Sequence, residues 1–313
     1  MNDLSVLLIG GPDAGKSNYL FRLWLAIDSN TGVLASDGLP NDVEYLKTGV
    51  IQLLRGEFAA KTPIEVHNES IIPVKFMRED KIIRGTLIVP DCAGEQWLGI
   101  YKKREWSEDW EQLVREGCGC LLFVRADSEQ IVPALDWISY FKLFGTTDAP
   151  VEPTEVAAAA PLSTAPLDIK EPPTQVVLVD WLQCLKRVFS SKVRGNYRPR
   201  VGIVVAAWDS IPEDQQDATP NQWLESNFPL LADFLDSNTD DFVFETFGIS
   251  IVGGDLKNDK SFRKAYCNGE PTTAGYVVLE IDGKAQRHPD VTLPVAWAMG
   301  LEKELFTEPH SSG

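Results

Sequence analysis

The chain contains one segment whose residue types and spacing suit it to bind phosphate. It has the form Gly10-x4-Gly15-Lys16-Ser17. The glycines let the backbone curve so that several N–H groups point inward, the lysine supplies positive charge, and the serine hydroxyl can bind Mg²⁺. The expected chemistry is Mg²⁺-assisted binding of a nucleoside polyphosphate, with Lys16 at its β- and γ-phosphates. The expected nucleotide contacts in this loop are Gly11, Pro12, Asp13, Ala14, Gly15, Lys16, Ser17 and Asn18.

Two further motifs follow apolar segments. In Asp91-Cys92-Ala93-Gly94, the aspartate can hold Mg²⁺ directly or through water, and the backbone N–H of the glycine can reach the γ-phosphate. The third motif ends in Asp209, whose carboxylate can accept hydrogen bonds from guanine N1–H and the exocyclic amino group. Adenine lacks that pair of donors, so Asp209 favours GTP over ATP. The alternative is that Asp209 is a turn or helix-capping residue.

Regular elements are expected to position these motifs. The apolar run 4–9 predicts a buried strand, and apolar residues at helical spacing predict a helix over 16–27. The charged turn 78–81 predicts an antiparallel hairpin. Further helices are predicted at 43–54, 106–116, 131–144, 176–188, 223–235 and 293–305, and further strands at 71–76, 82–89, 120–124, 201–206 and 242–252. This alternation predicts an α/β fold: a largely parallel sheet with one antiparallel hairpin and helices on both faces.

The domain organisation follows from composition along the chain. We expect a single domain over 1–305, with a flexible Pro/Ala-rich insert at 146–173 and a tail at 306–313 that resembles an expression-tag remnant. The insert is either an inert linker or a segment that docks a partner. No signal peptide or bilayer-spanning run is visible, and five cysteines without a CxxC pair are typical of a reducing cytoplasm. A net charge of −17 argues against nucleic-acid or membrane-surface partners.

The order of these motifs resembles that of Ras-like P-loop GTPases of the translation-factor-related class. Within that class the chain is most similar to the bacterial double-GTPase group, which occurs beside larger partner proteins in conflict or phage-defence gene clusters. The resemblance covers about residues 4 to 305 apart from the insert. It implies GTP or GDP with Mg²⁺ as ligands, and a protein effector or a second GTPase as partner. A homodimer is also compatible with the sequence.

The resemblance also assigns roles to further residues. The base-specificity motif of such GTPases is usually Asn-Lys-x-Asp, but here Ala206 and Ala207 replace the first two residues. The lysine normally lays its aliphatic stem over the base, and Trp208 is the nearest residue that could compensate by packing. The switch-one threonine, a metal ligand and γ-phosphate sensor, corresponds to Thr62 or alternatively to Thr48. The loop that touches the base corresponds to 248–250, with Ser250 as its contact residue.

One departure from the resemblance concerns catalysis. The residue after the second motif is commonly a glutamine that orients the attacking water, but here it is Glu95, followed by Gln96. A carboxylate near the γ-phosphate is repelled, although it can act as a base toward water. We therefore expect slow hydrolysis that a partner accelerates. No arginine finger is identified, and Arg125 is interpreted as solvated or salt-bridged. The expected catalytic residues are Lys16, Thr62, Gly94, Glu95 and Gln96, and the expected metal ligands are Ser17, Thr62 and Asp91.

Three functions are compatible with these features. The first is a GTP-driven molecular switch with slow hydrolysis, and the second is a GTP-bound scaffold that does not hydrolyse its nucleotide. The third is an ATP-dependent phosphotransferase. That class normally has an arginine-rich lid, and the 29 basic residues of this chain are scattered without a cluster.

Overall fold

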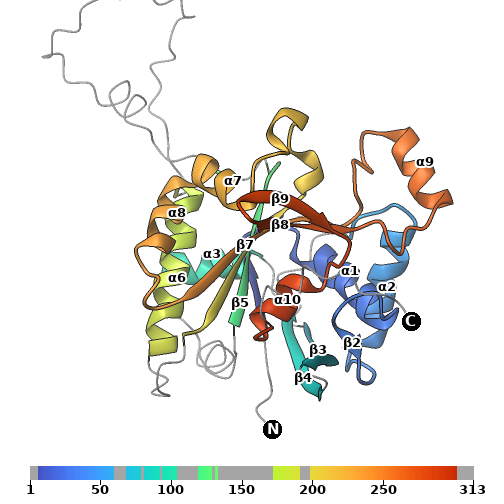
Figure 1. The fold of residues 1–313 in the computed structure, drawn as a ribbon, viewed down its shortest axis with the longest axis horizontal. Helices are drawn as coiled ribbons and strands as arrows, with labels where there is room; N and C mark the ends of the chain where they lie inside the picture. Colours follow the sequence, from blue (N-terminus) through green and yellow to red (C-terminus); the bar gives the residue numbers. More distant parts are fainter. Residues whose placement is uncertain are drawn as a thin grey trace, which may run out of the picture.

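A six-stranded sheet forms the centre of the molecule in this computed structural model (Figure 1). The structure describes residues 6–59, 68–78, 81–91, 94–103, 119–128, 131–132, 172–190 and 198–301. The strand order is β1-β5-β6-β7-β8-β9. Pairing is parallel from β1 through β7 and antiparallel for β8 and β9. The strands are β1 Val6–Gly10, β5 Gly119–Arg125, β6 Arg200–Ala206, β7 Val243–Ser250, β8 Tyr276–Ile281 and β9 Lys284–His288.

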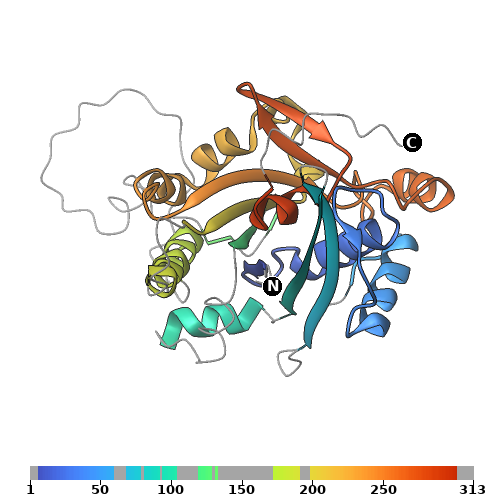
Figure 2. The ribbon, with the colours of Figure 1, turned by 60° about the horizontal axis from the view of Figure 1, so that its bottom comes forward.

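A second, antiparallel sheet contains the predicted hairpin. It consists of β2 (Ala35–Ser36), β3 (Asn68–Arg78) and β4 (Lys81–Asp91). β3 and β4 pair along their whole length, and β4 lies beside β1 (Figure 2). The fold class is confirmed, while β2 and the hairpin β8–β9 were not predicted. The expected helix 106–116 lies outside the described residues, as do most of the expected helix 131–144, nearly all of the insert 146–173, and the tail.

Helices cover both faces of the central sheet. Side chains alternate along β1, with Val6 and Leu8 in one hydrophobic cluster and Leu7 and Ile9 in another. The first cluster includes side chains of α1 and α10, and the second includes those of α6 and α8. Because strands buried on both faces are apolar throughout, these segments appear in the sequence as continuous apolar runs. The helices are α1 Lys16–Asp28, α2 Val43–Leu54, α3 Gly94–Lys103, α6 Thr174–Ser190, α7 Pro220–Asn227, α8 Pro229–Asp236, α9 Lys260–Asn268 and α10 Leu293–Ala298.

Two predicted helices differ from the structure for identifiable reasons. The segment 223–235 belongs to two helices, because Pro229 has no N–H to continue the ladder and Phe228 leaves the helical conformation. The final helix is shorter than predicted, because Gly300 has a left-handed φ of +105°. The N–H of Leu301 then bonds back to the carbonyl of Ala296, which closes the helix end. Helices α3 and α9 were not predicted.

A buried carboxylate fixes the loop that follows α1. Asp290, which is 4% exposed, accepts hydrogen bonds from the backbone N–H of Val33 (2.7 Å) and from the N–H and hydroxyl of Thr292 (2.8 and 2.7 Å). The hydroxyl of Tyr19 in α1 donates to the carbonyl of the neighbouring residue Val291. These bonds attach α1 and the loop that follows it to the segment that leads into α10. No helix among the described residues is long and apolar enough to cross a membrane.

We expect Asp290→Ala to lower the free energy of unfolding by roughly 2 kcal/mol or more, because three donors lose a charged acceptor inside the protein. Urea denaturation followed by circular dichroism measures this difference. Asp240→Ala, at an exposed position, is the matched control and should leave the midpoint nearly unchanged. Equal midpoints for the Asp290 and Asp240 variants would contradict the anchoring role.

Candidate nucleotide-binding site

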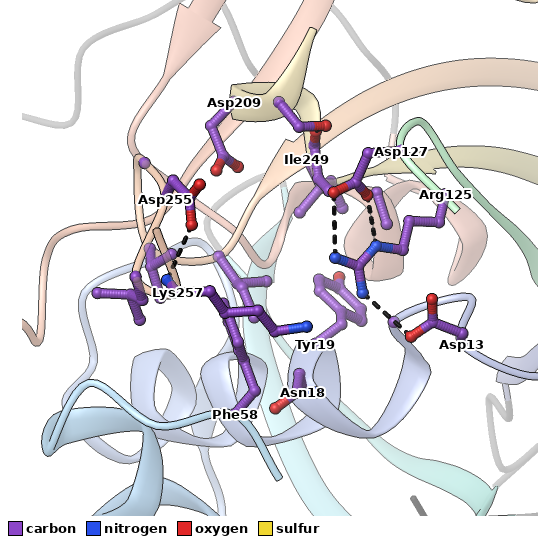
Figure 3. A pocket seen from close by; sticks show the side chains of 18 of the residues that line it. Asp13, Asn18, Tyr19, Phe58, Arg125, Asp127, Asp209, Ile249, Asp255 and Lys257 are labelled. Atoms are coloured by element: carbon purple, nitrogen blue, oxygen red, sulfur yellow. Dashed lines mark hydrogen bonds and ion pairs between the residues drawn. The ribbon is translucent and has the colours of Figure 1, made fainter. Parts of the chain in front are cut away.

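The carboxyl ends of four parallel strands open into one pocket of about 660 Å³ (Figure 3). This volume lies within the usual range for small-molecule sites. Its walls come from the loop after β1, the end of β5, the turn after β6 and the loop after β7, with one side chain from the segment after α2. The side chains that line it include Asp13, Asn18, Tyr19, Phe58, Arg125, Asp127, Asp209, Asp255, Lys257 and Asn258.

The loop between β1 and α1 has the conformation of a phosphate-binding loop. Gly15 has φ of +92°, in the region that glycine adopts without strain, and α1 begins at the next residue without an acidic side chain in its first turn. The Lys16 ammonium donates to the carbonyls of Gly10 (2.7 Å) and Gly11 (3.0 Å). A helix N-terminus and a lysine held at the loop suit a bound phosphate. Pro12 and Ala14 lie in the same loop, and Ser17 is the second residue of α1.

An ion-pair network crosses the pocket beside this loop. The guanidinium of Arg125 contacts the carboxylates of Asp127 (2.5 Å) and Asp13 (3.2 Å). Burial lowers the pKa of Arg125, but Asp127, Asp13 and Asp209 outweigh burial and raise it. Asp13 itself has φ of +58°, a left-handed conformation within the loop. The salt-bridged interpretation of Arg125 is therefore confirmed.

Asp209 lines the pocket, while Ser250 contacts it from behind and does not line the pocket, so the expected direct contact of Ser250 with the base is not available in this structure. Asp209 follows β6 in a single helical turn, Trp208–Ser210. Burial raises the pKa of its carboxyl, and a hydrogen bond with Ser250 partly offsets that rise. Ser250 is fully buried at the end of β7, where its hydroxyl also accepts the N–H of Gly253 (2.8 Å). A carboxylate so placed can accept hydrogen bonds from donors inside the pocket.

The expected base contact by Trp208 is not available in this structure. Trp208 is fully buried in the core beneath the pocket, where its ring packs against Gly248 and lies 6.5 Å from the ring of Trp223. The reason is local: Ala207 adopts a left-handed φ of +57°, and the chain turns after β6. The small side chains of Ala206 and Ala207 line the pocket instead.

The threonine assignments have different outcomes. Thr62 lies outside the described residues. Thr48 lies within α2, where its hydroxyl donates to the carbonyl of Glu44 (2.8 Å), and it does not line the pocket. The segment that leads toward Thr62 is fixed at its start, because the side-chain oxygen of Asn18 accepts the N–H of Ala59 (2.9 Å). Asn18 thus joins α1 to that segment.

The remaining predicted residues lie where β4 meets α3. Asp91 is the last residue of β4, and Gly94, Glu95 and Gln96 are the first residues of α3. Both elements lie against β1, the strand that leads into the phosphate-binding loop. Among the described residues, no group of three or more His, Cys, Asp or Glu side chains could hold a metal ion.

Comparison with known proteins identifies the family. Residues 7–298 match the family described as Double-GTPase 1. The chain belongs to the Double-GTPase 1 family. Membership supports guanine-nucleotide binding and GTP hydrolysis for this Double-GTPase 1 member. No functionally curated protein matches its sequence.

A solved structure similar to this Double-GTPase 1 member is the Roco2 RocCORdC fragment of Methanosarcina barkeri bound to GDP. The two share 14% sequence identity with a TM-score of 0.30, and the match covers 85% of this chain and 47% of that chain. The present chain therefore spans about half the length of that structure.

Several pocket residues were missed from the sequence. Asp127 follows the predicted strand 120–124, and its position after a buried strand was an available clue. Phe58 and Lys257 come from segments that gave no strong periodicity. The Gly253-Gly254-Asp255 sequence after β7 is typical of a tight turn and could have indicated a shaped loop.

We expect Asp209→Asn to stabilise the protein at neutral pH. The pKa of Asp209 is raised in the folded state, so its ionised form opposes folding, and this cost appears as pH rises through the folded-state pKa. The advantage of the variant should therefore vanish at acid pH, where Asp209 is protonated in both states. Urea unfolding of the variant and the wild type, at neutral and at acid pH, measures this difference in stability.

Asp255→Asn is the matched control in the same pocket. Hydrogen bonds from Asn258 lower the pKa of Asp255, so its ionised form favours folding, and this contribution is lost as pH falls through the folded-state pKa. The Asp255 variant should therefore show no gain at neutral pH. A gain for both variants, or for neither, would contradict the electrostatic account of Asp209.

Proposed function

We propose that this protein is a guanine-nucleotide switch that binds GTP with Mg²⁺ and hydrolyses it slowly. One observation carries the proposal: the phosphate-binding loop, through Asp13 and Gly15, lines the same pocket as Asp209. The loop supplies backbone donors and Lys16 for the phosphates. Asp209 supplies an acceptor suited to the N1–H and amino group of guanine.

Each phosphate-side residue has a distinct proposed role. Lys16 exchanges its hydrogen bonds with the loop carbonyls for phosphate oxygens. Ser17, Asp91 and Thr62 hold Mg²⁺, which neutralises charge on the phosphates when bound. Thr62 and Gly94 contact the γ-phosphate, so their segments change position when that group is lost. Family membership and the loop geometry support these roles.

We expect Lys16→Ala to weaken GTP binding about 100-fold, because a charge-assisted phosphate contact is lost.

Asp209→Asn should weaken GTP binding by a similar factor, about 100-fold, since one of the two guanine donors loses its acceptor. Xanthine carries a carbonyl where guanine has its amino group, so the amide that Asp209→Asn introduces should restore binding to xanthosine triphosphate. Calorimetric titration measures the GTP affinity of both variants and the xanthosine triphosphate affinity of the Asp209 variant. Unchanged selectivity in the Asp209 variant would remove that residue from base recognition.

Hydrolysis is proposed to be slow because of the residue that follows Gly94. Glu95 places a carboxylate beside a developing negative charge, where other GTPases commonly have glutamine. Gln96 is the remaining side chain that could orient water. A partner would supply the missing stabilisation, and a protein effector or second GTPase in a bacterial conflict or defence system is the proposed context. We place this activity in the cytoplasm.

We expect Glu95→Gln to raise the single-turnover rate of GTP hydrolysis about 10-fold, because it removes a like charge near the γ-phosphate. Single-turnover kinetics with radiolabelled GTP measures the rate. A slower variant would show that Glu95 acts as a base instead.

Gln96→Ala with unchanged turnover would remove Gln96 from the mechanism. A wild-type protein that retains GTP through purification without turnover would favour the alternative of a non-hydrolysing scaffold.

A further inference from the structure

The turn after β6 supplies no side chain that could cover a purine ring. Ala206 and Ala207 replace the residues that follow the strand in the usual base motif, and their methyl groups are too short to extend over a base. Trp208 is buried in the core. Asp209 can select a base by its hydrogen-bond donors, but these bonds reach only one edge of the base and leave the faces of the ring uncovered. A flat apolar surface must come from elsewhere in the pocket.

Two side chains from distant segments meet at this place. Phe58 comes from the segment after α2, and Lys257 comes from the loop after β7. The ammonium of Lys257 lies 6.0 Å from the centre of the Phe58 ring. Figure 3 shows the lysine stem extending across the pocket beside that ring, with its ammonium directed toward Asn18 and Tyr19 of α1. The stem and the ring thus lie near one another, across the pocket from Asp209.

The loop that carries Lys257 has a defined conformation. The carboxylate of Asp255 accepts the N–H groups of Lys257 (2.8 Å) and Asn258 (2.9 Å). The next residue after Asp255, Leu256, is 3% exposed and packs in a cluster with Leu53 of α2. This loop is therefore anchored on the same side of the molecule as the segment that carries Phe58, and the lysine is presented from a fixed backbone.

Charge also distinguishes Lys257 from its neighbours. The pocket is lined by the carboxylates of Asp13, Asp127, Asp209 and Asp255. Arg125 is engaged by two of them. Within the described part of the chain, Lys257 is the other pocket-lining cation, and no ion pair to a carboxylate engages its ammonium there. In a chain of net charge −17, this ammonium is available to an anionic ligand.

We propose that Lys257 and Phe58 form the wall against which the purine of the nucleotide packs, in place of the missing motif lysine. The methylene stem and the ring supply apolar contact, and the ammonium adds attraction for the phosphates. This inference rests on the proposed nucleotide-binding function. In this proposal the residues that pack against the face of the purine come from the segments after β7 and α2, and not from the turn after β6.

Calorimetric titration of variants of this chain with GDP tests whether Lys257 and Phe58 pack against the purine. We expect Lys257→Ala and Phe58→Ala each to weaken GDP binding about 10-fold, the lower range for loss of base stacking. Lys257→Met keeps an apolar stem and should lose about 3-fold or less. Because both residues form one surface, the double variant should lose less than the product of the two single losses.

The matched control is Lys260→Ala, an exposed lysine outside the pocket lining that changes the net charge equally. It should bind GDP within about 2-fold of wild type. Lys257 is itself exposed, so its variants should fold normally. If Lys16→Ala loses binding while Lys257→Ala does not, the wall is wrong and the proposed function stands. The proposed wall would also be contradicted if Lys257→Met lost as much GDP affinity as Lys257→Ala. It would likewise be contradicted if Lys260→Ala lost as much GDP affinity as Lys257→Ala. Absence of GDP binding by the wild type would instead refute the proposed function.

Discussion

The parallel register of four buried strands is the constraint on which the site depends. Gly10 of β1 pairs with Phe123 of β5, Arg125 pairs with Ala206 of β6, and Ala206 pairs with Ile249 of β7. All four strands therefore end at one edge. The loops that leave this edge carry phosphate-binding groups, an arginine, a carboxylate and a buried hydroxyl from segments far apart in the sequence. Ligand sites at the carboxyl ends of parallel strands follow from the same geometry in other α/β proteins.

An acidic protein that binds an anion must arrange its charges locally. The net charge of −17 opposes a nucleotide at long range, and four aspartates line the pocket. We propose that the opposing attraction comes from the α1 N-terminus, from Lys16 held at the loop, and from Lys257. Asp209 is partly buried, and this burial raises the pKa of its carboxyl. Sites that sacrifice stability in this way are usually those where a ligand later makes the missing contacts.

The sequence was sufficient for features that local chemistry determines. The glycine loop, the continuous apolar strands and the hairpin 71–89 each follow from residue type and spacing, and the structure has them. It was insufficient where tertiary contacts decide. The β8–β9 hairpin pairs with β7 through contacts between distant segments, and Phe58 and Lys257 converge only because the segments after α2 and β7 pack together. The error over Trp208 came from one left-handed residue, Ala207, because backbone direction after a strand cannot be deduced from an alanine.

We propose that this pocket selects a guanine nucleotide by its base and holds it by its phosphates. Calorimetric titration of the wild-type protein with GTP, GDP and ATP, with and without Mg²⁺, tests it most directly. We expect binding of GTP and GDP, tighter GTP binding with Mg²⁺, and ATP binding weaker by about 100-fold, because ATP leaves the partly buried Asp209 carboxylate without its donors. Equal affinities for ATP and GTP would contradict it.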